Sequence, residues 1–531
     1  MTISDESTFL GIDLSTQQLK AVVINNELQT LHEAQVQFDC DLPEFRTHGG
    51  VVIHPQDSRV VTAPPLMWVK ALDMLLDRLR VAGVDFSQIA SLSGAAQQHG
   101  SVYWSKGALS KLESLNPDRF LHEQLATCFS VTQSPVWMDS STTEQCRRLE
   151  DAVGGPLALA ELTGSRAYER FTGPQIAKLF DTRPSTYHST ERISLVSSCV
   201  ASLFLGKYAA LDYSDASGMN LLNIHTKEWS QECLKSCAPD LAEKLGEPVP
   251  SYSVLGPVSD YFVERYGFSP DCRVVAFTGD NPGSLIGMCM AEGDLVVSLG
   301  TSDTLILDLK KPQTLGEGHI LCSPLTPDTF MGLLCFKNGS IPRNRINEKC
   351  TEGSWQIFSE LLDSTPRGNF GNFGLYYDVQ EIVPFVVGDY RFNKAGVHVS
   401  RFASNEVEVR ALIEGQFVAR RAHAEDLGFI AGNNTRILAT GGASKNHCIL
   451  QVLADVFNVP VYTQEVSNSA ALGSAYQAKF ALIRESTTFK DMTAHLPSPT
   501  LVCSPYKDAQ AVYNPMVARY RAAIKNILQN K

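Results

Sequence analysis

The chain is 531 residues long, carries a formal net charge of −12 at pH 7, and is 44% hydrophobic and 19% charged. This length exceeds what one hydrophobic core usually supports, so we expect a globular protein of two or more domains. The acidic balance argues against a nucleic acid partner, because affinity for phosphate backbones comes mainly from basic patches. Small-molecule substrates fit the composition better.

The sequence also predicts a compartment. No apolar run approaches the roughly 18 residues that span a bilayer, and the segment MTISDESTFL lacks a basic region followed by an apolar stretch. We therefore expect no membrane association and a cytoplasmic protein. The 13 cysteines are scattered without a C-x-x-C pair, which indicates a reducing environment.

In chain order, the first expected elements are two strands, at 9–13 and 19–24, joined by a polar turn into a hairpin. The tip carries Asp13, Ser15 and Thr16. Hydroxyls and backbone N–H groups at such a tip suit phosphate oxygens, and the carboxylate suits a magnesium ion. Acidic hairpin tips are also common on plain surfaces, so an ordinary turn is the alternative.

The next region predicts a helix followed by a strand. Residues 66–81 place apolar residues at helical spacing, which indicates a packing helix. Residues 89–94 form the next expected strand, and Gln97, Gln98 and His99 follow its end. These amide and imidazole groups suit hydrogen bonds to a hydroxylated ligand, with a structural histidine as the alternative.

Two charged residues beyond this strand each have two interpretations. Asp139 stands in a polar cluster typical of a helix N-cap, so capping is its simplest role. Arg170 can clamp a sugar hydroxyl or form a surface ion pair with a nearby acid. Further along we expect a helix at 194–204, a polar loop at 212–218 and a strand at 221–224.

Residues 274–304 are the stretch around which we expect the chain to be organised. An apolar, β-branched run at 274–280 predicts a buried strand that delivers Asp280 to an open edge. Asn281 begins a turn, a helix-compatible stretch follows, and a second strand leads into the Gly-Thr-Ser turn at 300–302. The alternative is an ordinary strand–helix–strand unit of a doubly wound domain.

The strand–turn–strand pattern of the first hairpin recurs at 298–309, which suggests an internal duplication. The later expected elements are, in order, a strand at 331–336, a helix at 407–427, a strand at 436–440, a helix from about 444 and a last helix at 470–482. Gly441 and Gly442 follow the strand at 436–440. Paired glycines before a helix let a backbone approach a bound nucleotide closely.

Four motifs together resemble, in order and spacing over nearly the whole chain, those of the FGGY carbohydrate kinases of the actin-like ATPase superfamily. They are GIDLST at 11–16, GDN at 279–281, SLGTS at 298–302 and TGGAS at 440–444. No G-x-x-x-x-G-K-[ST] occurs and no G-x-G-x-x-G follows a strand, so neither a Walker-type NTPase nor a dinucleotide dehydrogenase is supported. Within the family, residues 97–100, 136–139, 212–215 and 336–340 most resemble the animal enzymes that phosphorylate xylulose.

The resemblance implies an α/β fold of two RNase-H-like domains with an active-site cleft between them. Residues 1–282 would mainly bind the sugar and residues 283–531 mainly the nucleotide. It also implies that ATP, with Mg²⁺, phosphorylates D-xylulose to D-xylulose 5-phosphate, with Asp280 as the general base on the sugar hydroxyl. The implied contacts are sugar binding by His99, Arg170, Asp280 and Asn281, metal binding by Asp13, and ATP binding by Thr16, Gly300, Thr301, Ser302, Trp355, Gly441, Gly442 and Lys445.

This sequence departs from the family pattern at two positions and leaves some alternatives open. The family usually has glycine where Ser15 and Ala443 stand. Serine at position 15 puts in doubt a close approach of the first hairpin's backbone to the phosphates, and alanine at position 443 leaves less room beside the adenine base. Trp355 is equally readable as a core aromatic. Another sugar or polyol of the same family (ribulose, glycerol or gluconate) is an alternative acceptor, and an actin- or Hsp70-like ATPase switch is an alternative function.

Overall fold

The computed structural model describes residues 4–290, 293–311, 313, 316–432, 435–464 and 468–529. The chain forms two compact units. The first comprises Met1–Cys289, Ile320–Thr329 and Val466–Leu496, and the second comprises Met290–His319, Phe330–Glu465 and Pro497–Lys531. The expected domain boundary between residues 282 and 283 stays a prediction. Residues 1–3 of the first expected domain, and 291–292, 312, 314–315, 433–434, 465–467 and 530–531 of the second, lie outside the described residues.

The first unit is built on a mixed sheet in the order β10-β11-β6-β1-β2-β3, with β12 also paired to β6. Its strands are β1 (Thr8–Leu14), β2 (Gln18–Ile24), β3 (Thr30–Gln37), β6 (Ile89–Ala96), β10 (Val254–Pro257), β11 (Arg273–Val275) and β12 (Thr278–Gly279). Strands β1, β11 and β12 run parallel to β6, whereas β2 is antiparallel to both β1 and β3. The predicted first hairpin and the strand at 89–94 are confirmed.

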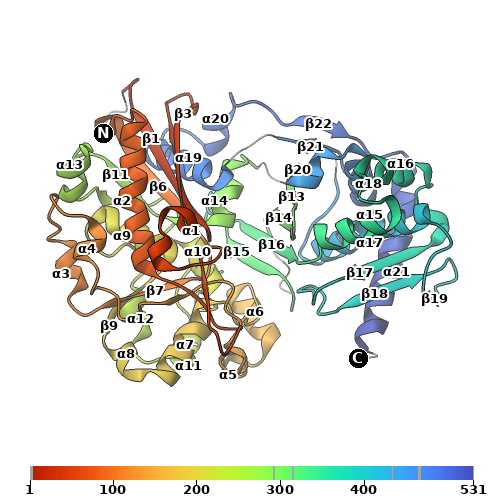
Figure 1. Cartoon of the computed structure of the whole chain (residues 1–531), viewed down its shortest axis with the longest axis horizontal. Coiled ribbons are helices and arrows are strands. Elements are labelled where there is room, and N and C mark those ends of the chain that lie inside the picture. The colour runs from red at the N-terminus through yellow and green to blue at the C-terminus, as the bar shows by residue number, and fades with distance from the viewer. Residues whose placement is uncertain are drawn as a thin grey trace. The chain divides into compact units, whose positions relative to one another are not determined.

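Helices cover both faces of this sheet because the side chains of β1 alternate between them. Leu10, Ile12 and Leu14 lie in one core cluster with residues of α2 (Pro65–Val81) and α9 (Val196–Leu205). Gly11 meets α19 (Ser469–Ile483), where an added Cβ would lie 2.0 Å from the Ala471 carbonyl oxygen. The close packing of α19 on β1 (Figure 1, blue on red) therefore requires a residue without a Cβ.

Helix α14 (Asp280–Gly287) follows β12 and also packs on α19. The two helix backbones approach closely at Gly283, Gly287 and Gly473: a Cβ at Gly473 would lie 2.0 Å from the Gly283 carbonyl oxygen, and one at Gly287 would lie 2.0 Å from the Ser469 carbonyl oxygen. Because no side chains separate the helices at these points, α19 fixes where the first turn of α14 lies.

The second unit contains a second mixed sheet with strands in the order β16-β14-β13-β20-β21-β22. The strands are β13 (Leu295–Leu299), β14 (Asp303–Leu309), β16 (Phe330–Phe336), β20 (Ile437–Thr440), β21 (Val461–Thr463) and β22 (Thr500–Cys503). Strand β13 is antiparallel to β14 and parallel to β20, as β1 is to β2 and β6. The two units therefore repeat one arrangement, in agreement with the predicted duplication and α/β fold class.

The remaining strands form small sheets or edges, and helices pack around both sheets. The remaining strands are β4 (Val52–Ile53), β5 (Val61–Ala63), β7 (Ser101–Ser105), β8 (Ser134–Pro135), β9 (Thr190–Leu195), β15 (His319–Cys322), β17 (Phe373–Tyr377), β18 (Gly388–Phe392) and β19 (His398–Val399). The other long helices are α5 (Thr143–Val153), α6 (Pro156–Thr163), α7 (Thr172–Thr182), α15 (Ser340–Thr351), α16 (Trp355–Ser364), α17 (Asn405–Asp426), α18 (His447–Phe457) and α21 (Ala509–Gln529). None of the described helices is long and apolar enough to cross a membrane.

Several predicted elements are wrong. Residues 212–218 are a short helix, α10 (Tyr213–Ala216), running into the 3-10 turn η3 (Ser217–Met219), because the Asp212 carboxylate accepts the first backbone N–H groups as an N-cap. The described residues 221–224 form only an isolated bridge and no strand. The expected strand at 274–280 is broken into β11 and β12, and α21 follows the helix that was expected to be the last.

Candidate active site

Three parallel strands of the first unit end at the same edge and place polar residues there. Strands β1 and β12 both pair with β6, and Asp13 and Thr278 are both level with Ala95. Asp13 therefore lies at the end of β1, Asp280 directly after β12, and Gln98 and His99 directly after β6. Since carboxyl ends of parallel strands meet at one edge, residues far apart in sequence converge on one site.

Asp280 is the first residue of α14. Its Oδ1 accepts the Asn281 backbone N–H at 2.8 Å and the Asn281 Nδ2 at 3.1 Å. Burial, followed by the nearby Asp13 carboxylate, raises the pKa of Asp280 to about 7, against backbone N–H groups that lower it. A carboxyl group whose pKa lies near neutral pH is suited to take a proton from a substrate hydroxyl.

Asp13 is buried at the end of β1. Its Oδ2 accepts the Ser15 hydroxyl at 2.7 Å, while among the described residues no group donates to Oδ1. Burial raises the pKa of Asp13, against the Ser15 hydrogen bond and Lys20, which lower it. A buried carboxylate oxygen without a protein donor fits Mg²⁺ or one of its waters, since Mg²⁺ takes one or two carboxylates and keeps several waters.

His99 lies in the left-handed region at φ 71°, beside a glycine. Its Nδ1 is 2.8 Å from the Gly218 carbonyl oxygen. Because a carbonyl only accepts, Nδ1 carries the proton and Nε2 is an acceptor. Burial, followed by Arg170, lowers the pKa of His99 to about 3, so the ring is neutral.

Arg170 lies beside this histidine. Its guanidinium is 5.0 Å from the Tyr168 ring centroid and 5.8 Å from that of Phe171, and the Phe171 ring in turn stacks on His99 with centroids 4.3 Å apart. The structure therefore brings together Asp13, His99, Arg170, Asp280 and Asn281, which are all in the first unit.

Thr16, at the tip of the first hairpin, is held by a residue from a distant segment. The indole Nε1 of Trp137 donates to the Thr16 hydroxyl at 2.9 Å. The hydroxyl oxygen accepts that bond and keeps its own proton to donate. Trp137 is 44% exposed, so this contact orients an otherwise open aromatic side chain against the hairpin tip.

In the second unit, Gly300, Thr301 and Ser302 form the turn between β13 and β14. The Gly300 carbonyl oxygen accepts the Ser340 backbone N–H at 2.9 Å and Arg343 Nη2 at 3.2 Å. The Thr301 and Ser302 side chains are exposed. The turn is thus attached through its carbonyl groups to the start of α15, with its two hydroxyl side chains open to solvent.

A buried group of charges supports this turn. Asp303, the first residue of β14, accepts Arg343 Nη2 at 2.7 Å and Arg420 Nη2 at 2.9 Å, and all three side chains are at most 3% exposed. The Arg343 guanidinium also holds the Gly300 carbonyl oxygen. Two arginines on one aspartate, all with buried side chains, fix the turn more rigidly than backbone bonds alone.

The Gly441 turn lies at the same edge of the second sheet. Strand β20 pairs with β13, and a Cβ on Gly441, whose φ is +85°, would lie 2.6 Å from the Leu299 carbonyl oxygen. A Cβ on Gly442 would meet no atom within 4 Å, and Gly441, Gly442 and Lys445 are exposed. This turn offers an open backbone surface next to the end of β13.

Trp355 begins α16 and is 41% exposed, so it is not a core aromatic. One turn along the helix, Ser359 Oγ donates to the Trp355 carbonyl oxygen and accepts Asn446 Nδ2 at 2.9 Å. Asn446 directly follows the 3-10 turn η5 (Gly442–Lys445). The structure therefore places Trp355, Gly441, Gly442 and Lys445 in one region of the second unit.

Sequence reasoning missed part of the site. Asp139 does not cap a helix: α5 begins after Thr142, and Asp139 accepts the Val61 backbone N–H at 3.1 Å and Gln175 Nε2 at 2.7 Å. The buried Asp215 and the Asp303–Arg343 pair received no role, because their sequence neighbours are largely polar and give no local sign of burial.

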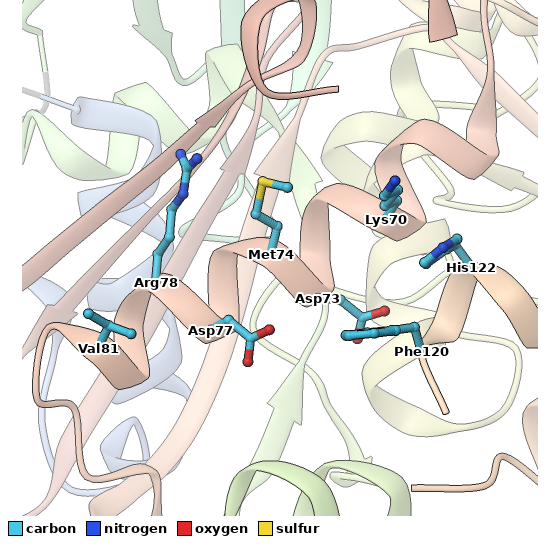
Figure 2. A pocket seen from close by; sticks show the side chains of 8 residues that line it. All are labelled: Lys70, Asp73, Met74, Asp77, Arg78, Val81, Phe120 and His122. Atoms are coloured by element: carbon cyan, nitrogen blue, oxygen red, sulfur yellow. The ribbon is translucent and has the colours of Figure 1, made fainter. Parts of the chain in front are cut away.

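One surface hollow of the described residues lies apart from the predicted site residues. This hollow of about 400 Å³ lies against α2 and is lined by Lys70, Met74, Arg78, Phe120 and His122, among others (Figure 2). Its basic side chains are already engaged, Lys70 by Glu44 and Arg78 by Asp41. It contains none of the predicted site residues.

Comparison with known proteins identifies the family. Residues 129–287 match the N-terminal domain and residues 295–482 the C-terminal domain of the FGGY family of carbohydrate kinases. Xylulose kinase of Rattus norvegicus is 56% identical over 520 residues, covering 98% of this chain and 97% of the relative, and xylulose kinase 2 of Arabidopsis thaliana is 47% identical over 490 residues, covering 90% and 88%. The solved structure of ligand-bound xylulose kinase from Lactobacillus acidophilus shares the fold at a TM-score of 0.79 and 19% identity, covering 98% of both chains. The chain therefore belongs to the FGGY family of carbohydrate kinases and is an ATP-dependent carbohydrate kinase.

Proposed function

We propose that this chain transfers the γ-phosphoryl group of ATP to the primary hydroxyl of D-xylulose, giving D-xylulose 5-phosphate. The relatives at 47% and 56% identity are xylulose kinases, which supports this sugar as the acceptor. The observation that carries the chemistry is the Asp280 carboxyl, half-buried beside Asp13, Gln98 and Asn281, with its pKa raised to about 7.

Asp280 acts as the general base on the sugar hydroxyl. Phosphoryl transfer needs little covalent help from the protein, but the acceptor oxygen must lie in line with the γ-phosphorus and lose its proton. The carboxylate is fixed through Oδ1 by two bonds from Asn281. His99, as the neutral ring with Nε2 accepting, and Arg170, as a donor, complete the binding of the sugar hydroxyls.

The proposed nucleotide contacts are those that the sequence motifs imply, residue by residue. Asp13 would hold Mg²⁺ directly or through water. Thr16, Gly300, Thr301 and Ser302 would approach the phosphates, and Gly441, Gly442, Lys445 and Trp355 would contact the adenosine part. When bound, Mg²⁺ supplies positive charge that compensates the charge on the phosphoryl oxygens. The Arg343 and Arg420 bonds to Asp303 keep the Gly300 turn rigid as that charge develops.

A coupled ADP-release assay with a panel of acceptors tests the proposal. We expect ADP release only when a sugar is present, fastest with D-xylulose and slower with ribulose, glycerol and gluconate, and phosphate on the terminal carbon of the product. Another acceptor with a higher kcat/KM would replace D-xylulose as the substrate. ATP consumption that is independent of any sugar would instead support an ATPase switch.

A further inference from the structure

Residues 212–218, buried throughout apart from the half-exposed Tyr213, touch the active-site strands and loops at three points. Asp212 Oδ2 accepts the Thr278 hydroxyl at 2.8 Å, two residues before Asp280. Asp215 Oδ1 accepts Gln98 Nε2 at 3.4 Å. The Gly218 carbonyl accepts His99 Nδ1 at 2.8 Å. One short segment thus contacts the residues that lie on both sides of the base.

The Asn281 side chain has a defined orientation in this network. Its Nδ2 donates to Asp280 Oδ1 at 3.1 Å and to Gln98 Oε1 at 3.0 Å. A carboxylate only accepts, so the nitrogen of the amide must face Asp280. Both N–H groups are then used inside the protein, and the amide oxygen of Asn281 is left as an acceptor.

The orientation of Gln98 decides whether this arrangement holds. Its oxygen faces Asn281, so its nitrogen must find an acceptor on the other side, and Asp215 Oδ1 is that acceptor. The second oxygen of Asp215 accepts the Ser197 hydroxyl at 2.6 Å. Gln98 is 3% exposed and Asp215 is 1% exposed, so water cannot easily replace either bond.

We propose that Gln98 and Asp215 are positioning residues, which fix the Asn281 amide with its oxygen toward the sugar and thereby select an acceptor that donates a hydroxyl proton there. This inference rests on the proposed function, because it assumes that Asn281 contacts the sugar. Neither Gln98 nor Asp215 touches the substrate. A site built to pair with one hydroxyl loses discrimination when that group is no longer held in place.

Two variants and two controls test the inference. Gln98→Met keeps the length of the side chain and removes both hydrogen bonds, and Asp215→Leu removes the acceptor. Asp215→Asn retains an oxygen that accepts from Gln98. Ser217→Ala is a matched control in the same segment, because Ser217 Oγ donates to the Tyr213 carbonyl and accepts the Cys322 backbone N–H outside this chain of bonds.

We expect Gln98→Met and Asp215→Leu to lower kcat/KM for D-xylulose by about 10–100-fold, the range for residues that orient a ligand-binding group. The loss should appear mainly as a higher KM for D-xylulose, with the KM for ATP unchanged. Asp215→Asn should restore kcat/KM to within about threefold of the wild type. Ser217→Ala should lower Tm, because it breaks two buried bonds, and leave the KM for D-xylulose unchanged.

The inference is overturned if folded Gln98→Met binds and turns over D-xylulose like the wild type, or if Asp215→Asn is as impaired as Asp215→Leu. If Asp215→Leu does not fold, Gln98→Met and Asp215→Asn still decide between these outcomes. A wild-type chain that does not phosphorylate D-xylulose refutes the proposed function instead, and this result is recognisable before any variant is made.

Discussion

Replacing Asp280 by asparagine removes the proposed base with little change in shape. The asparagine oxygen can still accept the Asn281 backbone N–H that Asp280 Oδ1 accepts at 2.8 Å, so the start of α14 keeps its bond. The variant loses a negative charge at a helix N-terminus, which costs about 0.3–1 kcal/mol of stability. It also relieves the repulsion from Asp13, which acts in the opposite direction. We therefore expect Tm to change by only a few degrees.

The effect on turnover should be far larger than the effect on stability. Loss of a general base lowers kcat by about 10²–10⁴, which corresponds to about 3–5 kcal/mol in the activation barrier. Because the base must be ionised, the wild-type kcat/KM should fall about tenfold for each pH unit below about 7, the pKa of Asp280. The asparagine variant has no such group, so its residual activity should lack this acidic limb.

A coupled assay of ADP release with D-xylulose between pH 5 and 9 measures both effects. Calorimetric titration with ATP provides the control, since nucleotide affinity should stay within about threefold of the wild type if Asp280 acts on the sugar. Turnover within a factor of about ten of the wild type, or an acidic limb that persists in the variant, would refute the role of Asp280 as the base.

Three further predictions concern the support of the site. Arg343→Met should raise the KM for ATP at least tenfold and destabilise the chain by about 3–5 kcal/mol in chemical denaturation, because Asp303 keeps a buried charge and loses one of its two partners. An unchanged KM for ATP would show that the Asp303–Arg343 pair does not support nucleotide binding. Gly441→Ala should raise the KM for ATP and lower Tm while leaving the KM for D-xylulose unchanged, because the new Cβ meets the Leu299 carbonyl oxygen in a left-handed backbone; a wild-type KM for ATP would contradict it. Burial raises the pKa of Asp73, which is labelled in Figure 2, from its ordinary value of 3.8 to about 6. Its contribution to stability is therefore fully present below pH 4 and is lost as pH rises through about 6. A shift of one pKa unit corresponds to about 1.4 kcal/mol, so this loss is about 3 kcal/mol. Denaturation curves of the wild type and of Asp73→Asn at pH 4 and pH 7 measure it. If the difference in stability between the two proteins is the same at both pH values, this role of Asp73 is excluded.

The sequence by itself determined the repeating local units. Alternating apolar residues on either side of a polar turn specify the hairpins at both Asp13 and Gly300, because period-two patterning and turn chemistry act over a few residues. The same local signals located the strand before Gln98 and the strand before Gly441. The order of these motifs along the chain also pointed to the family, which the comparisons confirm.

The tertiary structure alone decided which of these units meet. Residues 466–496 join the first unit because Gly11 and Gly473 let α19 lie against β1 and α14, and glycine contacts between distant segments leave no periodic signal in a sequence. The same holds for polar partners. The sequence predicted a polar loop at 212–218, yet burial turns Asp215 into the acceptor that orients Gln98. A buried polar group must find its partner wherever the fold supplies one.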